Sequence, residues 1–479
     1  MMSIYLIILL YLLVVLTVVV IIVNTNSTSK ALAYLMMVFI FPVAGIIIYF
    51  SVGVNYRKRK LYKKKLEIDE QKRSELDVEL KKYRSDILNH SKKLNYFQKL
   101  AESEHQELLL TTNQKTDLLI NGEEKFPKLI EDLKSAKKFI HIEYYIYEND
   151  NIGNEIAEIL MEKAQQGIEV RFIYDDFGSS GLQAKFKQKL KKSGVEAVPF
   201  YKIKWLFFAS RINYRNHRKI VVIDGKVGYI GGINVSDKYI NNGKNSLFWR
   251  DTHLRIEGLA VHLLQHAFLV DWNFCARQNI ELTPRYFPKN KTESEAPKQL
   301  VQIVSSGPDS DYPNILYAMV QAIMLSREEI LITTPYFIPD DTFLDALKIA
   351  ALSGVKIKIL VPGVSDSVFV NLVSTSYYQK LLEAGIEIYR YKKGFVHAKT
   401  MICDDLVSFI GTTNLDHRSF DLNFEIHAIV YDEELTQQHK TIMQEDFRNT
   451  EKLELSEWKK RSMLKIFMER IARLFSPLM

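Results

Sequence analysis

The sequence predicts an α/β protein made of two similar lobes that pack as a pseudo-dimer around one cleft, preceded by a two-helix transmembrane hairpin. Three observations support this prediction. Strand, helix and strand patterns follow one another in both halves of the chain. A short motif, with a His, a Lys two residues on and an Asp five residues further, occurs at residues 217–224 and again, 180 residues later, at 397–404. Two long apolar runs open the chain.

Length and composition limit the class of protein. The 479 residues allow about three domains, and the 47% of hydrophobic residues can bury a sizeable core. The net charge is +7, and part of that excess lies in one short segment. Cys275 and Cys403 are too few for a disulfide framework and have no metal-ligand spacing. We therefore interpret both as buried small apolar residues of a catalytic part in a reducing compartment.

Residues 1–55 are expected to lie in the membrane. Residues 4–23 are uncharged and long enough to cross a hydrocarbon core of about 30 Å as a helix, and a second apolar run, residues 31–54, follows a polar break. A cleaved signal peptide is the alternative. However, the chain does not begin with basic residues, and its first apolar run exceeds the usual signal-peptide length of about 7 to 15 residues.

A basic cluster after the second run predicts the orientation in the membrane. Residues 56–65 read YRKRKLYKKK, whereas the loop between the apolar runs carries only Lys30. Basic residues favour the cytoplasmic side, so we expect a multi-pass protein of the cell membrane whose remaining residues are cytoplasmic. The same cluster should attract anionic lipid headgroups.

The stretch 56–112 is predicted to be a juxtamembrane and linker segment. It is highly charged and helical in character, with apolar residues at heptad-like spacing: Leu76, Leu80, Tyr83, Ile87, Leu94 and Phe97. These span only about three heptads, fewer than a coiled coil needs. We expect either a stalk or a linker helix that packs on the catalytic part.

From residue 113 on, helical and strand patterns alternate. We divide this part into a first lobe (113–280), an interlobe connection (281–299) and a second lobe (300–450). The expected elements are strand 138–147, helix 152–167 ending at Gly167 and strand 168–176 in the first lobe, and strand 329–338, helix 341–353 stopped by Gly354 and strand 355–363 in the second. This order is typical of parallel strands joined by a crossover helix.

Two segments allow more than one interpretation. Residues 451–479 include a basic amphipathic helix, WKKRSMLKIFMERIARLF, which could dock on a membrane surface or pack on the lobes. Residues 204–210, KWLFFAS, mix basic and aromatic side chains and fit either a core strand or a segment that dips into the bilayer.

The duplicated motif is the strongest functional signal in the sequence. Positions two apart in a strand share a face, so His217 projects with Lys219, and His397 with Lys399. Asp224-Gly225 predicts a tight hairpin turn. The agreement extends beyond the motif, because five positions of the first half recur 180 residues later: His217, Lys219, Asp224, Gly231 and Asn234 match His397, Lys399, Asp404, Gly411 and Asn414. Five matches at one offset indicate an internal duplication.

These residue types suit a phosphodiester as substrate. Lys is a poor metal ligand, and no cysteine or carboxylate cluster accompanies the His residues, so we expect no metal. Displacement at phosphorus needs a nucleophile, a proton donor for the leaving oxygen, and positive or N–H groups around the other oxygens. Neither half holds a complete set. We infer that the two lobes share one cleft.

The sequence resembles the phospholipase D superfamily, whose defining feature is a duplicated His-Lys-Asp motif, and within it the bacterial cardiolipin synthases. The resemblance covers nearly the whole chain and includes IEYYIY, YDDFGSSG, NYRNHRK, WRDTHLRIEG, TPYFIPDD, GTTNLDHRSFDLNFE and the terminal ARLFSPLM. FPVAGIIIYFSVG, in the second apolar run, is similar to a membrane segment of that family. One departure is Thr412-Thr413, where the family often has Gly-Ser.

The resemblance implies roles for ten residues. His217 and His397 would be the nucleophile and the general acid and base, with the N-terminal His usually forming the phosphohistidine. Lys219, Lys399, Asn234 and Asn414 would hold phosphate oxygens. Asp251 and Glu425 would hydrogen-bond the two His and set their tautomers, although a reading as solvated charges remains open. Asp224 and Asp404 complete the catalytic signature, and we expect them to support the site structurally.

The implied reaction joins two phosphatidylglycerol molecules into cardiolipin and releases glycerol, with no metal or organic cofactor. Phosphatidylglycerol and anionic membrane lipids are the expected partners, nucleic acid is not expected, and no oligomeric state follows from the sequence. The implied location is the bacterial cell membrane. The alternatives are a phospholipase D hydrolase or another phosphatidyltransferase, a membrane-anchored nuclease, and a non-catalytic scaffold. The membrane hairpin argues against the nuclease, and two intact motifs argue against the scaffold.

Overall fold

A computed structural model describes most of the chain. Its described residues are 2–25, 28–50, 65, 92–101, 109–200, 214–242, 247–288, 299–310 and 312–479. The basic cluster at 56–65 lies outside this part except for Lys65, as do most of the linker and the KWLFFAS stretch at 204–210. Within the linker, Leu94 and Phe97 are described, and both are buried in the core of the second half.

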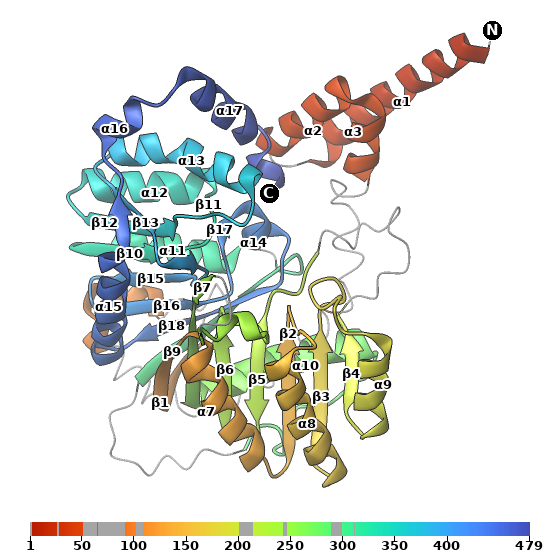
Figure 1. Ribbon diagram of the computed structural model, residues 1–479, viewed down its shortest axis with the longest axis vertical. Coiled ribbons are helices and arrows are strands. Elements are labelled where there is room, and N and C mark those ends of the chain that lie inside the picture. Colours follow the sequence, from red (N-terminus) through yellow and green to blue (C-terminus); the bar gives the residue numbers. More distant parts are fainter. Residues whose placement is uncertain are drawn as a thin grey trace.

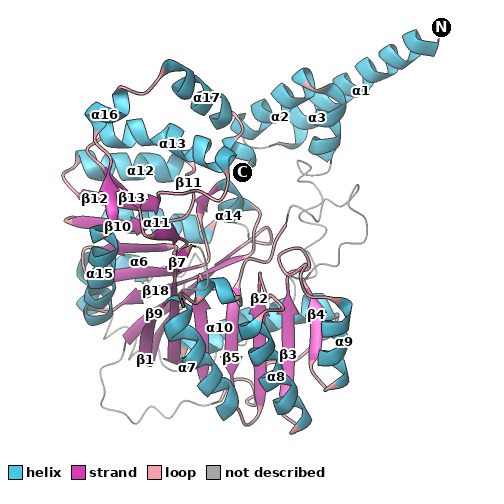
Figure 2. Cartoon of the chain, in the orientation of Figure 1, coloured by secondary structure: helices cyan, strands magenta, loops and turns pink. Residues whose placement is uncertain are grey.

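Most strands of the described part of the chain form one large mixed sheet (Figures 1 and 2). It has 15 strands in the order β19-β13-β12-β10-β15-β16-β18-β9-β1-β8-β6-β5-β2-β3-β4. The first half supplies β1 (Leu110–Ile120), β2 (Phe139–Tyr144), β3 (Glu169–Tyr174), β4 (Glu196–Pro199), β5 (Lys219–Ile223), β6 (Val227–Gly231) and β8 (Thr252–Gly258). The second half supplies β9 (Gln299–Ser306), β10 (Glu329–Thr333), β12 (Lys356–Pro362), β13 (Glu387–Tyr391), β15 (Thr400–Cys403), β16 (Val407–Gly411), β18 (Glu425–Tyr431) and β19 (Thr450–Lys452).

The strand order repeats outward from the centre of the sheet. β1 and β9 are antiparallel neighbours, and from this pair β8, β6, β5, β2, β3 and β4 run in one direction while β18, β16, β15, β10, β12 and β13 run in the other. Equivalent strands therefore occupy equivalent places. This arrangement brings the two motif histidines, which lie just before β5 and β15, to the same region of the fold.

Helices cover both faces of the sheet. They are α7 (Asn121–Ser135), α8 (Asn151–Gln165), α9 (Ala184–Lys192) and α10 (Ala260–Ala276) in the first half, and α11 (Asn314–Leu325), α12 (Asp341–Leu352), α13 (Val368–Glu383), α14 (His417–Asp421) and α15 (Glu433–Arg448) in the second. Along β5, Val221 and Ile223 join a core with α7 and α8, whereas Ile220 and Val222 join one with α10. Both faces are buried, so these strands are apolar throughout.

The predicted crossovers are confirmed. β2 pairs with β3, and β10 pairs with β12, in parallel register. In each unit the intervening helix is followed by a glycine with positive φ, 83° at Gly167 and 99° at Gly354. Only glycine adopts this left-handed conformation without strain, and there it ends the helix. The expected strand at 329–338 is divided into β10 and the short β11 (Phe337–Ile338), which pairs with β17 (Leu415–Asp416).

The hairpin predicted at Asp224-Gly225 is also confirmed, and the second motif ends in an equivalent turn. β5 and β6 are antiparallel around Asp224 (φ 53°) and Gly225 (φ 67°). β15 and β16 form the same turn around Asp404 (φ 50°) and Asp405 (φ 54°). Successive left-handed residues give the turn that matches the twist of the strands. The second half thus forms this turn with no glycine.

Among the described residues of the N-terminal segment, one helix has membrane-spanning length. It is α1 (Met2–Asn24), whose window Ile4–Asn24 has a mean hydropathy of 3.6 and is only 11% buried. Figure 1 shows it projecting away from the rest of the chain. By its length and composition, this helix is long and apolar enough to cross a bilayer.

The second apolar run does not form the straight spanning helix that the sequence predicts. It consists of α2 (Thr28–Ile40) and α3 (Pro42–Ile48), which fold back on each other so that the Tyr34 and Tyr49 rings lie 5.2 Å apart. Pro42 opens α3, because proline suits the first turn of a helix but interrupts a continuing one. Gly45 permits the close approach, since a Cβ there would lie 2.6 Å from the Met37 carbonyl oxygen.

Because of this fold-back, the end of α3 returns to the end of α1, where the apolar segment turned into α2. The Tyr49 hydroxyl donates to the carbonyl oxygen of Val20, near the end of α1, at 3.2 Å. The start of α2 lies against the sheet-containing body, where Lys30 forms an ion pair with Asp421 of α14. A two-helix hairpin would instead carry that part of the chain to the far side of the membrane.

Candidate active site

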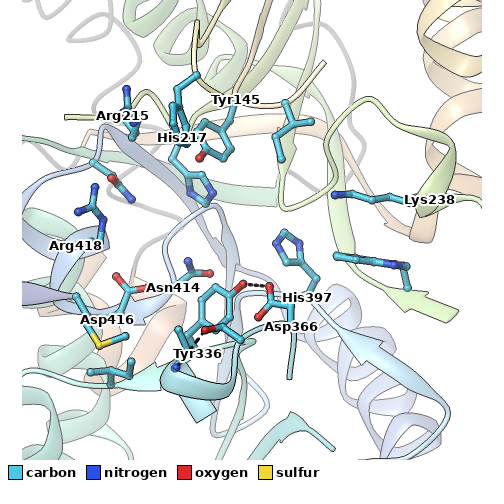
Figure 3. A pocket seen from close by; sticks show the side chains of 18 of the residues that line it. Tyr145, Arg215, His217, Lys238, Tyr336, Asp366, His397, Asn414, Asp416 and Arg418 are labelled. Carbon is cyan, nitrogen blue, oxygen red and sulfur yellow. Dashed lines mark hydrogen bonds between the residues drawn. The ribbon is translucent and has the colours of Figure 1, made fainter. Parts of the chain in front are cut away.

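A cavity of about 660 Å³ lies between the two halves (Figure 3). Both halves line it, with Tyr145, Arg215, His217, Lys238, Tyr239 and Trp249 from the first and Tyr336, Asp366, Val370, His397, Asn414, Asp416, Arg418, Asn423 and Met479 from the second, among others. The two motif histidines therefore meet at one cavity. Figure 3 shows their imidazole rings on opposite sides of it.

His217 sits just before β5 and is held by the second half. Its backbone N–H donates to the carbonyl oxygen of Phe424 at 2.9 Å. Its ring atom Nδ1 lies 2.9 Å from Oε2 of Glu425, the first residue of β18. Thr412 also donates its hydroxyl to that Oε2 atom. The carboxylate is thus fixed from two directions.

His397 follows β14 (Gly394–Val396) and is held by the first half. β14 pairs in parallel with β7 (Phe248–Arg250), and the His397 backbone N–H donates to the Arg250 carbonyl oxygen at 2.7 Å. Its Nδ1 atom lies 2.6 Å from Oδ2 of Asp251. Each half therefore supplies the carboxylate partner for the histidine of the other.

The carboxylates determine the tautomers of both histidines. Burial acts to raise the pKa values of Glu425 and Asp251, but His217 and His397 with the nearby lysines outweigh it, so both pKa values are lowered. An ionised carboxylate only accepts hydrogen bonds, so each Nδ1 must donate. In the neutral ring, Nε2 then carries the lone pair.

Burial favours the neutral form of both histidines. Burial is the largest influence and lowers the pKa of His217, against the opposing effect of Glu425. Burial, together with Lys399, lowers the pKa of His397 to about 3. A neutral imidazole is a nucleophile and a base, whereas a proton donor must first gain a proton.

The two motif lysines are buried behind the histidines. Lys219 Nζ donates to the His217 carbonyl oxygen at 2.7 Å, and Lys399 makes the equivalent bond to that of His397. Burial lowers the pKa of Lys219 to about 7 and that of Lys399 to about 8. The positive charge of Lys399 also lowers the pKa of Lys219. An anion placed between them would therefore relieve a repulsion between like charges.

The two motif asparagines differ in their contacts. The Asn234 side chain accepts from the Ile146 backbone N–H at 3.1 Å and donates to the Tyr239 hydroxyl at 2.8 Å. Asn414 lines the cavity, and its buried Oδ1 has no hydrogen-bond partner among the described residues. The duplication is thus asymmetric at this position.

Asp224 and Asp404 lie at the far ends of the motif strands. The Asp224 carboxylate accepts from the backbone N–H groups of Lys137, Lys138 and Phe139 at 2.8–2.9 Å. The Asp404 carboxylate accepts at 2.6–2.9 Å from three backbone N–H groups in the same position, those of Arg327, Glu328 and Glu329. Each aspartate ties its hairpin to the start of the neighbouring strand.

A buried cluster of charged residues contacts the first motif through Arg218. Arg218, between His217 and Lys219, donates to Asp271 of α10 at 2.6 Å. Lys65 lies 2.8 Å from the other oxygen of Asp271 and 2.5 Å from Asp309. Buried ion pairs of this kind are costly to break, so they fix the strand that carries His217.

Several cavity residues were not assigned by sequence reasoning. Arg215 precedes His217 by two residues, so the period of an extended chain could have found it. The ammonium of Lys238 lies over the Trp249 ring at 4.7 Å, and the Tyr336 hydroxyl donates to Asp366 at 2.5 Å (Figure 3). No pattern in the sequence links the last two pairs to the motifs.

The cavity is therefore suited to an anionic diester. Lys238, Arg215 and Arg418 bring positive charge to its lining, which also holds the carboxylates of Asp366 and Asp416 and the two histidine rings. Among the described residues, no group of three or more His, Cys, Asp or Glu side chains could hold a metal ion. Histidine, lysine and arginine side chains are the groups that phosphoryl transfer requires.

Comparison with known proteins identifies the family. The family model described as "Cardiolipin synthase, PLD-like domain" matches residues 129–267 and 319–447, one match in each half. The chain belongs to this family.

The relatives include cardiolipin synthase 2 of Staphylococcus epidermidis, which is 39% identical over 95% of this chain and 93% of that protein. Cardiolipin synthase 2 of Bacillus anthracis is 39% identical over 94% of this chain and 87% of that protein. A cardiolipin synthase of Staphylococcus aureus is 38% identical over 95% and 92%.

A solved structure shares the fold. The crystal structure of phosphatidylserine synthase from Haemophilus influenzae matches with a TM-score of 0.61 over 80% of this chain and 99% of that one, at 15% sequence identity. At this identity the likeness concerns the arrangement of helices and strands alone.

Proposed function

We propose that this chain is a phosphatidyltransferase that makes cardiolipin and glycerol from two molecules of phosphatidylglycerol. One observation carries the proposal: two histidines face one cavity, each hydrogen-bonded to a carboxylate from the opposite half. The two halves then act as the lobes of a pseudo-dimer with one shared site. Family membership and the cationic lining support a phospholipid as substrate.

In the first step, Nε2 of His217 attacks the phosphorus of one phosphatidylglycerol. A P–N bond forms, and the P–O bond to the glycerol headgroup breaks. His397 gives its Nε2 proton to the leaving oxygen, so glycerol departs neutral. His397 acquires that proton when the anionic diester binds, because a nearby negative charge raises the pKa of an imidazole.

In the second step, a hydroxyl of the second phosphatidylglycerol attacks the phosphohistidine. Neutral His397 takes the hydroxyl proton, the new P–O bond forms, and the P–N bond to His217 breaks. The product is cardiolipin, and both histidines return to their starting states. Asp251 and Glu425 hold the rings throughout and stabilise whichever ring is cationic.

The remaining motif residues support this chemistry. Lys219 and Lys399 supply positive charge behind the phosphate, and Asn414 offers its side-chain amide to a phosphate oxygen. Asn234 positions Tyr239 beside His397. Asp224 and Asp404 stabilise the hairpins through the backbone contacts described above.

The membrane arrangement follows from the N-terminal helices. We propose that α1 spans the bacterial cell membrane and that α2 and α3 enter the same membrane as a second, broken segment beside it. The basic cluster at 56–65 favours a cytoplasmic location for the body. Substrate then reaches the cavity from the inner leaflet.

A reconstitution experiment tests the function. The purified full-length chain, supplied with phosphatidylglycerol alone and a metal chelator, should form cardiolipin and glycerol in equal amounts. Release of phosphatidic acid without cardiolipin would identify a hydrolase instead, because water would then have taken the place of the lipid alcohol. The variants His217→Ala and His397→Ala serve as the inactive controls.

A further inference from the structure

The outward face of the C-terminal helix α17 (Met463–Arg473) is strongly apolar. Met463, Leu464 and Phe467 are 79%, 72% and 58% exposed, and Met468, Ile471 and Leu474 are also exposed. Their spacing of three and four residues places them on one side of the helix. Large contiguous apolar surfaces are rare on soluble proteins and mark sites of interaction.

The opposite face of α17 is fixed to the body. Glu469 and Ala472 are buried, and Glu469 accepts a hydrogen bond from Arg461 at 2.6 Å. The Arg473 guanidinium lies over the Tyr377 ring of α13 at 4.3 Å. The helix is therefore held in a definite rotation, which is the one that exposes its apolar face.

This face adjoins the membrane segment. Figure 1 shows α17 at the same end of the molecule as α1, α2 and α3. The short helix η7 (Ser476–Leu478) follows α17, and Leu478 packs against the apolar cluster formed by α1, α2 and α3. Leu32 of α2 is itself 61% exposed. The C-terminal end of the chain thus packs directly on the segment proposed to enter the bilayer.

We propose that α17 lies in the interfacial layer of the same bilayer, with its outward face among the acyl chains. An amphipathic helix with basic residues on its polar side binds anionic membranes in this way; α17 carries Lys465, Arg470 and Arg473. A second copy of the chain is the competing occupant, but it would not account for the packing of the C-terminal end of the chain on the segment proposed to enter the bilayer.

Docking of α17 would also position the cavity at the lipid surface. This part of the inference rests on the proposed function. Met479, just after η7, lines the cavity between the two halves of the chain. Val370, near the start of α13, lines it too. Beside Val370, Val368 and Phe369 are exposed, and the Phe369 ring lies 6.3 Å from that of Phe475. The docked helix would hold this side of the cavity against the lipid surface.

Fluorescence quenching tests the docking itself. In the full-length chain with Cys275→Ala and Cys403→Ala, an environment-sensitive probe is attached at Phe467→Cys, or at Met324→Cys on α11 as a matched exposed apolar control. The protein is reconstituted in vesicles of phosphatidylethanolamine and phosphatidylglycerol. The probe at 467 should be quenched by nitroxide-labelled lipid and protected from aqueous iodide, and the probe at 324 should show the reverse.

Two outcomes would overturn the proposal. Iodide quenching at 467 equal to that at 324 would leave the face in water. Protection at 467 from both quenchers would mean that protein, such as a second copy of the chain, covers it. Neither readout depends on catalysis, so docking can stand even where the proposed reaction fails.

An activity measurement tests the placement of the cavity. Leu464→Glu with Phe467→Glu should lower cardiolipin formation on vesicles at least about tenfold, because burying even one large apolar side chain exceeds the roughly 1.4 kcal/mol that this factor represents. Activity on a monomeric short-chain phosphatidylglycerol should be unchanged, and Met324→Glu should be neutral on both substrates. Equal losses on vesicles and monomers would contradict the placement.

Discussion

The ring of His217 and the carboxylate of Glu425 lie 2.9 Å apart although 208 residues separate them in the chain. The reciprocal pair, His397 and Asp251, lies at 2.6 Å across 146 residues. Each carboxylate comes from the half that does not hold its histidine. Neither half holds a motif histidine together with its carboxylate partner, so the geometry of the cavity depends on both halves.

Removal of either histidine should abolish transfer for a different reason. His217→Ala removes the nucleophile, and His397→Ala removes the proton donor. A substrate with a p-nitrophenol leaving group needs no proton donor, so His397→Ala should still release nitrophenol from it while His217→Ala should not. His266→Gln, on α10 and away from the cavity, is the control. Nitrophenol release by His217→Ala would reverse the two assignments.

The carboxylate partners should matter through the tautomer. Glu425→Gln and Asp251→Asn keep the side-chain shape but cannot accept from Nδ1–H in the same way, so we expect kcat to fall by about 10²- to 10⁴-fold with little change in the melting temperature. Glu257→Gln, on a half-exposed strand residue, controls for loss of charge. Full activity in either variant would mean that these carboxylates act only as solvated charges.

Asp224 and Asp404 should affect stability more than chemistry. Each accepts three backbone hydrogen bonds, and loss of such charge-assisted bonds should lower the free energy of unfolding by on the order of 3 kcal/mol. Alanine also tolerates the positive φ poorly. Asp224→Ala should therefore melt at lower temperature but keep kcat per folded molecule, and Asp224→Asn should be milder. A large loss of kcat in a variant with unchanged melting would contradict this division.

Activity should decline on the alkaline side through substrate binding. Burial lowers the pKa values of Lys219 and Lys399 to about 7 and about 8. Both are cationic below those values and neutral above them, so attraction for the phosphate is lost as pH rises. In the free enzyme, kcat/KM should fall between about pH 7 and pH 9. Measurement of kcat and of kcat/KM across that pH range tests this prediction, and a rise in kcat/KM would contradict it.

Sequence reasoning reached the site residues that repeat and, through the family resemblance, Asp251 and Glu425, but it missed the other residues of the cavity. The offset of 180 residues isolates His217 and His397, and strand periodicity places each lysine beside its histidine. The exchange of carboxylates between halves depends on strand order, which no local pattern contains. Tyr336 and Asp366 likewise meet only because β11 and α13 approach each other in space.

The same limit explains the second apolar run. Its hydropathy predicts a spanning helix, but Pro42 and the close approach at Gly45 bend it into α2 and α3. Hydropathy averaged over a window does not register such a bend. The crossover helices, in contrast, end where Gly167 and Gly354 predict, because a glycine at the end of a helix acts locally.

The fold-back of α2 and α3 has a consequence for membrane topology. A two-helix hairpin would place the N-terminus on the cytoplasmic side with the body. In the structure, the end of α1 and both ends of the α2–α3 pair lie toward the body, as the Lys30–Asp421 ion pair and the Tyr49–Val20 hydrogen bond show. With α1 across the bilayer, we expect the N-terminus to lie on the outer face.

Labelling with a membrane-impermeant maleimide distinguishes the two arrangements. In the background with Cys275→Ala and Cys403→Ala, Ser3→Cys should react from outside intact cells, whereas Leu352→Cys, at an exposed position on α12, should react only in inverted vesicles. Labelling of both positions in inverted vesicles alone would establish the hairpin, and α2 and α3 would then have to straighten in the bilayer. Labelling of Leu352→Cys from outside would place the body itself on the outer face, against the charge of residues 56–65.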